Sequence, residues 1–184
     1  MALSLTKKIV RLHRALDRAA VSHAFGGALA LAFCTSDPRA THDIDVNVFL
    51  TSSRLPELLH ALPSGVTSDE TSRRSLQRDG QARLWWDETP VDVFLSNHPF
   101  HDAAQRRTRT VPFAGVAALP VLDCTDLAVF KAFFARPKDA VDIASMVEAD
   151  ALDGERLLTT VTELLGAESP NVALARRALS REPL

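Results

Sequence analysis

The spacing of apolar residues predicts a mixture of helices and short strands in the first third of the chain. Ile9, Leu12 and Leu16 recur at helical spacing, with basic residues between them. The run of residues 44–50, IDVNVFL, is apolar and β-branched, which is typical of a buried strand. The elements expected here are a helix over residues 5–21, strands over 23–25 and 44–50, and helices over 28–33 and 54–61.

A hairpin is predicted in the middle of the chain. Residues 82–86 and 91–95 are strand-like and flank a turn-like spacer that ends at Pro90. Asp92 lies between Val91 and Val93, so strand alternation turns it to the opposite face from these valines. Weaker strand patterns follow over residues 111–113 and 116–122.

From Thr125 onward the pattern becomes helical, with helices expected over residues 126–135, 138–149, 154–165 and 171–181. The expected fold class is therefore α/β (α+β): a small mixed sheet with helices over residues 1–122, then a helical region over residues 123–184. No linker separates the two regions, so we expect them to pack as one unit.

Composition and charge narrow the class of protein. The chain has 184 residues, 46% hydrophobic and 24% charged, which is ordinary for a globular protein. Two cysteines exclude a disulfide-dense scaffold, and no signal peptide or membrane span is expected, which favours a cytoplasmic protein. The net charge of −2 gives no hint of nucleic-acid binding, although arginine far outnumbers lysine.

Two aspartates at the start of the predicted strand 44–50 are the strongest chemical signal. Side chains at i and i+2 of a strand share a face, so Asp43 and Asp45 bring two carboxylates together. Two such charges about 4 Å apart repel by roughly 4 kcal/mol at an effective dielectric of 20, which favours a bound cation. Oxygen ligands suit Mg²⁺ or Mn²⁺, and Asp92 is available as a third carboxylate.

A glycine pair precedes these acids. The Gly26-Gly27 turn leads into a helix, whose first backbone N–H groups are able to cradle phosphate oxygens. Metal-binding carboxylates facing a phosphate cradle are the parts of a phosphoryl- or nucleotidyl-transfer site.

The order G-G, R-x-T-x-D-I-D and a later strand aspartate resembles the polymerase-beta-like nucleotidyltransferase superfamily. The downstream segment K-A-F-F-A-R-P-K-D-A-V-D-I, residues 131–143, resembles the AbiEii/MenT-type nucleotidyltransferase toxins. The resemblance covers roughly residues 20–145. It implies a magnesium- or manganese-dependent transfer of NMP from an NTP to an RNA 3′-hydroxyl, with tRNA as the expected acceptor. It also implies a protein antitoxin partner, and we expect the free chain to be monomeric.

The resemblance also implies roles for individual residues. The metal ligands would be Asp43, Asp45 and Asp92, with Asp92 also helping to activate the attacking hydroxyl. The residues assigned to the nucleotide would be Gly26, Gly27, Arg39, Thr41, Lys131 and Arg136, and Asp142 would be the late family aspartate. One position departs from the family, because many members have serine where this chain has Gly27.

Simpler interpretations stay open for several of these residues. Asp92 could form a salt bridge to an arginine, Lys131 could extend from an apolar helix face, and Asp142 could pair with Lys138 on the surface. Two arginine clusters could contact RNA or only solvent, namely Arg73, Arg74, Arg78 and Arg83, and Arg106, Arg107 and Arg109. Alternative functions are nucleotidyl transfer to a small molecule such as an antibiotic, and an inactive binding module of the same fold.

Overall fold

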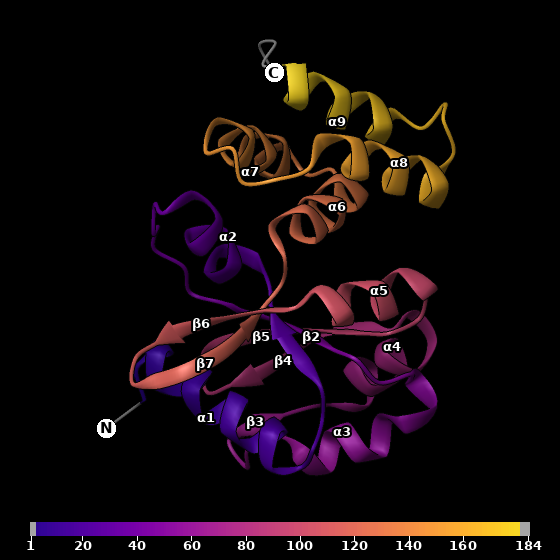
Figure 1. Cartoon of the computed structure of the whole chain (residues 1–184). Helices are drawn as coiled ribbons and strands as arrows, with labels where there is room; N and C mark the ends of the chain where they lie inside the picture. Colours follow the sequence, from indigo (N-terminus) through magenta and orange to yellow (C-terminus); the bar gives the residue numbers. More distant parts are fainter. Residues whose placement is uncertain (1–2, 181–184) are drawn as a thin grey trace. The chain divides into compact units, whose positions relative to one another are not determined.

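The computed structural model describes residues 3–180, which divide into two compact units (Figure 1). The first unit comprises residues up to 29 and residues 40–122, and the second comprises residues 30–39 and those from 123 onward. Strands labelled β1 to β7 in Figure 1 all lie in the first unit, and helices α6 to α9 all lie in the second.

A seven-stranded mixed sheet forms the centre of the first unit, in the order β3-β4-β5-β2-β1-β7-β6. Its strands are β1 (His23–Phe25), β2 (Ile44–Val48), β3 (Val66–Thr67), β4 (Gln81–Trp86), β5 (Thr89–Leu95), β6 (Arg109–Phe113) and β7 (Val116–Val121). Strand β2 runs parallel to β5 and antiparallel to β1. The predicted hairpin is confirmed as β4 and β5, which pair antiparallel through a two-residue turn.

Several helices of the first unit begin or end at capping residues that the sequence provides. The helices of this unit are α1 (Leu5–Arg18), the start of α2 (Gly27–Thr35), the 3-10 turn η1 (Ser52–Arg54), α3 (Leu55–Ala61), α4 (Glu70–Asp79) and α5 (Pro99–Arg107). The Ser4 hydroxyl caps α1, whose apolar stripe is buried as predicted. Asp69 caps the start of α4, and Gly80, at φ +70°, ends it.

Two helices and one lysine differ from the sequence expectations. No helix was expected where α4 and α5 form; α4 buries only Leu76, so it has no apolar stripe to recognise. Lys8, one of the basic residues outside the apolar stripe of α1, is nevertheless buried. Its ammonium donates to the Trp86 carbonyl at 2.6 Å and to the Thr89 hydroxyl at 3.0 Å, so it ties α1 to the β4–β5 hairpin.

The second unit is helical, as expected. It contains α6 (Cys124–Phe134), α7 (Pro137–Glu148), α8 (Gly154–Leu165), α9 (Pro170–Ser180) and the later part of α2. Cys34 on α2 and Cys124 on α6 form a disulfide, a pairing the sequence did not predict. None of the helices within residues 3–180 has the length and apolar character needed to cross a membrane.

Candidate active site

The central feature of the site is a row of three charged residues across neighbouring strands. Asp45 on β2 pairs in register with Asp92 on β5, and Asp92 pairs in register with Arg83 on β4. Directly paired residues project to the same face of a sheet. The two predicted carboxylates, 47 positions apart in sequence, are therefore adjacent on one face of the first unit, with a guanidinium beside them.

Asp43 lies just before β2, two residues from Asp45, and both side chains are half-buried. The Thr41 hydroxyl donates a hydrogen bond to Oδ1 of Asp43. Thr41 therefore orients the first carboxylate in this structure, whereas the resemblance assigned it to the nucleotide.

The glycine pair lies at the end of β1, next to Asp45. The Gly26 N–H donates to the Asp45 carbonyl at 2.9 Å, and helix α2 begins at Gly27. Gly27 has φ +52°, and a Cβ there would lie 1.8 Å from Asp45 Oδ2. At the position where many members of the resembling family have serine, the Asp45 carboxylate fills the space that a side chain would need.

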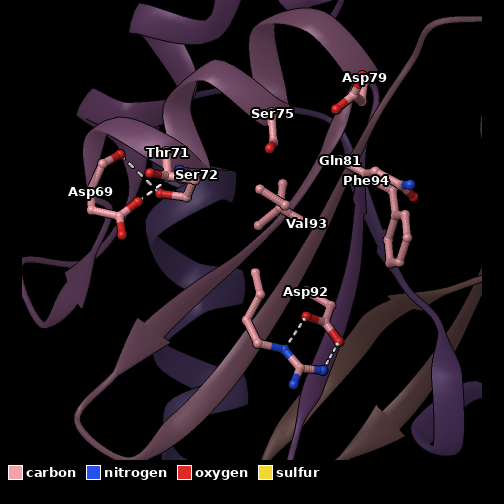
Figure 2. Close-up of a pocket in the computed structure, with 11 residues that line it drawn as sticks. Asp69, Thr71, Ser72, Ser75, Asp79, Gln81, Asp92, Val93 and Phe94 are labelled. Carbon is pink, nitrogen blue, oxygen red and sulfur yellow. Dashed lines mark hydrogen bonds and ion pairs between the residues drawn. The ribbon is translucent and has the colours of Figure 1, made fainter.

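Asp92 forms a two-pronged ion pair with Arg83. Nε of Arg83 lies 2.8 Å from Oδ1 and its NH2 group lies 2.8 Å from Oδ2, and Figure 2 shows both Asp92 oxygens engaged in this way. The salt bridge considered for Asp92 is therefore confirmed. The hydrogen bonds and charge of Asp92 raise the pKa of Arg83, and the charges of Asp43 and Asp45 add to this shift.

Two of the three predicted carboxylates are placed as ligands for a hard divalent cation. Asp43 and Asp45 supply carboxylate oxygens, as Mg²⁺ or Mn²⁺ requires, and Asp45 lies beside the Gly26–Gly27 turn. Within residues 3–180, however, no three acidic, histidine or cysteine side chains converge as a metal-binding group. The third predicted ligand, Asp92, is turned to Arg83, so the three-carboxylate set stays a prediction.

The remaining predicted residues lie together in the second unit. The Lys131 ammonium, which is buried, contacts Asp142 and lies 3.5 Å from Oδ1 of Asp139. Arg39 contacts both oxygens of Asp142, at 2.7 and 2.9 Å. Arg136 pairs with Asp139, and together they form the capping box of α7.

This network corrects two of the simpler interpretations. Asp142 is buried and pairs with Lys131 and Arg39, so the alternative of a surface pair with Lys138 is wrong. Lys131 does not extend from an apolar face to solvent, because it is enclosed by two carboxylates. Burial pushes the pKa of Asp142 up, but the hydrogen bonds and charges of Arg39 and Lys131 outweigh it and hold that pKa below its usual value.

Two residues near the carboxylates were not assigned to the site from the sequence. The sequence indicates for Arg83 only an arginine cluster that faces RNA or solvent, and it indicates no role for Asn47. Asn47 shares the face of Asp45 on β2, and its amide nitrogen lies 3.2 Å from the Cβ position of Gly26. Its Oδ1 is buried without a hydrogen-bond partner among residues 3–180. A polar residue at i+2 from Asp45 in a buried strand was the available signal.

A cavity of about 460 Å³ adjoins Asp92 in the first unit. Figure 2 shows Asp92 and Val93 at its strand side and Ser72, Ser75 and Asp79 at the side of α4. Its further lining residues are Asp69, Thr71, Gln81, Ala82, Arg83 and Phe94. The lining is rich in hydroxyl, amide and carboxylate groups, which suits a polar ligand.

Comparison with known proteins gives matches at the level of family and fold. The solution structure of antibiotic-resistance factor ANT(2'')-Ia matches with a TM-score of 0.54 and 16% identity, over 96% of this chain and 91% of that one. Its complex with adenylyl-2''-tobramycin matches with a TM-score of 0.53 and 15% identity, over 96% and 97%. An antigenic nucleotidyltransferase-like protein from Paracoccidioides brasiliensis matches with a TM-score of 0.50 and 18% identity, over 94% and 91%.

At these identities the solved structures establish a common fold, and they confirm the predicted nucleotidyltransferase fold class. No curated protein matches the chain. A family model described as "Nucleotidyltransferase of unknown function (DUF6036)" matches residues 3–171, nearly the whole chain. The chain therefore belongs to this family of nucleotidyltransferases, enzymes of the transferase type.

Proposed function

We propose that the chain transfers the nucleotidyl group of an NTP to a hydroxyl group of an acceptor bound beside Asp92. The observation that carries this proposal is the registered pair Asp45–Asp92 next to the Gly26–Gly27 turn. In the reaction the acceptor oxygen bonds to the α-phosphorus, the bond from that phosphorus to the bridging oxygen breaks, and pyrophosphate leaves. The hydroxyl proton passes to Asp92 or to water.

The triphosphate would lie at the start of α2. The backbone N–H groups of a glycine turn that opens a helix bind phosphate oxygens. Asp43 and Asp45 would hold Mg²⁺ or Mn²⁺, whose charge would stabilise the transition state and the leaving pyrophosphate. Thr41 then serves to orient Asp43. Lys131, Asp142, Arg39 and Arg136 stay predictions from the resemblance.

A small polar molecule is the acceptor that the geometry supports best. The cavity beside Asp92 has about 460 Å³, within the range of small-molecule sites, and its hydroxyl-rich lining suits a polyhydroxylated ligand. ANT(2'')-Ia, which shares the fold, has been captured with adenylyl-2''-tobramycin, a nucleotidylated aminoglycoside. Both observations support a sugar-like acceptor.

An RNA 3′-hydroxyl, with tRNA as the expected acceptor, is the second candidate. It would make the chain the AbiEii/MenT-type toxin of a toxin–antitoxin pair, with a protein antitoxin as partner. The arginines at the end of α5 and the start of β6, namely Arg106, Arg107 and Arg109, favour it. In the other cluster, Arg74 pairs with Glu70, Arg78 with Asp79 and Arg83 with Asp92.

Label transfer from NTPs separates the candidates. Each [α-³²P]NTP is incubated with Mg²⁺ and either tobramycin and related aminoglycosides or total tRNA. Label on the small molecule supports the first candidate, and label on tRNA supports the second. In either case Asp45→Asn should abolish transfer, whereas Glu163→Gln, which removes an exposed carboxylate from α8, should leave it intact. Transfer that survives Asp45→Asn would contradict the proposed site.

A further inference from the structure

Arg83 has a position in the site that the sequence motifs do not assign. It completes the row Arg83–Asp92–Asp45 across β4, β5 and β2. Its guanidinium engages both oxygens of Asp92, each at 2.8 Å. Two-pronged pairs of this kind are the most directional ion pairs in proteins, so the orientation of the Asp92 carboxylate is set by Arg83.

The guanidinium also lies within the field of the other two carboxylates. The pKa of Arg83 is raised first by the hydrogen bonds and charge of Asp92, and then by the charges of Asp43 and Asp45. Three acids gathered on one face of a sheet repel one another unless a positive charge offsets them. In the absence of a bound ion, Arg83 supplies that charge from within the chain.

The ion pair between Arg83 and Asp92 is accessible to solvent, so its two side chains are able to separate. The Arg83 side chain is 51% exposed and that of Asp92 is 20% exposed, and both line the cavity beside the row. An ion pair with this much solvent contact favours the paired over the unpaired arrangement of the two side chains by a factor of about five at most. A divalent ion held by carboxylates attracts Asp92 more strongly than Arg83 does. Metal binding is therefore able to break the Arg83–Asp92 pair.

Resting on the function proposed above, we propose that Arg83 is the resident counter-ion of the carboxylate row, holding Asp92 when no metal is bound and releasing it when metal and nucleotide enter. Arg83 therefore competes with the metal for Asp92. It lowers metal affinity, and it keeps the Asp92 carboxylate turned to the guanidinium until the substrate complex has assembled. Its role is to position Asp92, and not to touch the reacting atoms.

Binding of Mn²⁺ alone, followed by electron paramagnetic resonance, tests this role without any turnover. Arg83→Met keeps most of the side-chain volume and removes the charge, whereas Arg83→Lys keeps the charge and loses the fork. We expect Arg83→Met to bind Mn²⁺ on the order of fivefold more tightly than the wild type, with Arg83→Lys in between. The control is Arg78→Met, because Arg78 forms the same kind of fork with Asp79 on exposed α4.

A second substitution connects the effect to Asp92. In an Asp92→Asn background, Arg83→Met should no longer change Mn²⁺ affinity, because the competition concerns that carboxylate. Circular dichroism verifies that each variant is folded, and if Arg83→Met does not fold, the comparison rests on Arg83→Lys. Mn²⁺ binding that requires Asp45 but is unchanged or weaker in the Arg83 variants would overturn the counter-ion role alone. No Mn²⁺ binding by the wild type or any variant would overturn both that role and the proposed metal-dependent function.

Discussion

The contact between Gly27 and Asp45 gives the sharpest prediction about the site. A Cβ at position 27 would lie 1.8 Å from Oδ2, 2.4 Å from Cγ and 2.9 Å from Cβ of Asp45. Gly27→Ala therefore forces the Asp45 side chain out of its position. The new alanine also has to adopt φ +52°, which costs about 1–2 kcal/mol in the left-handed region. Moving Asp45 off its rotamer adds roughly 1 kcal/mol, so we expect a loss of about 2–3 kcal/mol of unfolding free energy.

Gly115→Ala is the matched control for this substitution. Gly115 lies between β6 and β7 with φ +82°, and no atom lies within 4 Å of its Cβ position. It carries the same kind of backbone penalty, about 1–2 kcal/mol, without a collision. Urea denaturation of both variants should show Gly27→Ala to be the more destabilising by roughly 1 kcal/mol.

Asp45→Ala then links the difference to one side chain. In the Asp45→Ala background the two nearest atoms are absent, so Gly27→Ala should lose most of its extra cost. In the wild-type background Gly27→Ala should also reduce nucleotidyl transfer at least tenfold, on the order of the loss of one well-placed ligand group. Equal destabilisation by the two glycine substitutions, without coupling to Asp45, would refute the reasoning.

Three further predictions concern the framework. Lys8→Met leaves the buried Trp86 carbonyl without its 2.6 Å donor, so unfolding free energy should fall by about 1–3 kcal/mol in a thermal melt. Burial lowers the pKa of His23 to about 4, so the folded state keeps it neutral while the unfolded chain protonates below about pH 6.5. Stability is then complete above pH 6.5 and declines by up to roughly 3 kcal/mol as the pH falls to 4; a pH series in which His23→Phe shows the same decline would contradict this. The disulfide Cys34–Cys124 closes a separation of 90 residues, so its reduction should lower stability by up to about 4–5 kcal/mol, measured by denaturation with and without dithiothreitol.

The local pattern of the sequence was sufficient to predict most strands and the side of the sheet on which the acids lie. Strand β5 alternates strictly, with Val91, Val93 and Leu95 buried, so the half-buried position of Asp92 followed from period alone. For Asp43 and Asp45, the spacing of two residues was enough to predict that both side chains lie on one face. Helix α4 could not be found in this way, because Leu76 is its only buried residue and no apolar stripe forms; its signals were the cap residues Asp69 and Gly80.

The ion pairs depended on register and on tertiary structure, which the apolar pattern does not contain. Arg83 opposes Asp92 because the β4–β5 turn has two residues, Asp87 and Glu88, whereas the sequence allowed a longer spacer. The contact of Asp142 with Arg39 joins residues 103 positions apart, and no local pattern predicts it. The cytoplasmic location stays a prediction. The Cys34–Cys124 disulfide counts against it, because disulfides are rare in the reducing cytosol.

Calorimetric binding of an α,β-methylene NTP in the presence of Mn²⁺ tests the central claim most directly, because it needs no acceptor and the analogue cannot be cleaved. The account predicts one metal-dependent site per chain, with affinity reduced at least tenfold by Asp45→Asn and by Gly27→Ala, and unchanged by Glu163→Gln or Gly115→Ala. Binding that is equally strong in Asp45→Asn, or equally strong without the metal, would contradict the assignment of the nucleotide to the carboxylates and the glycine turn.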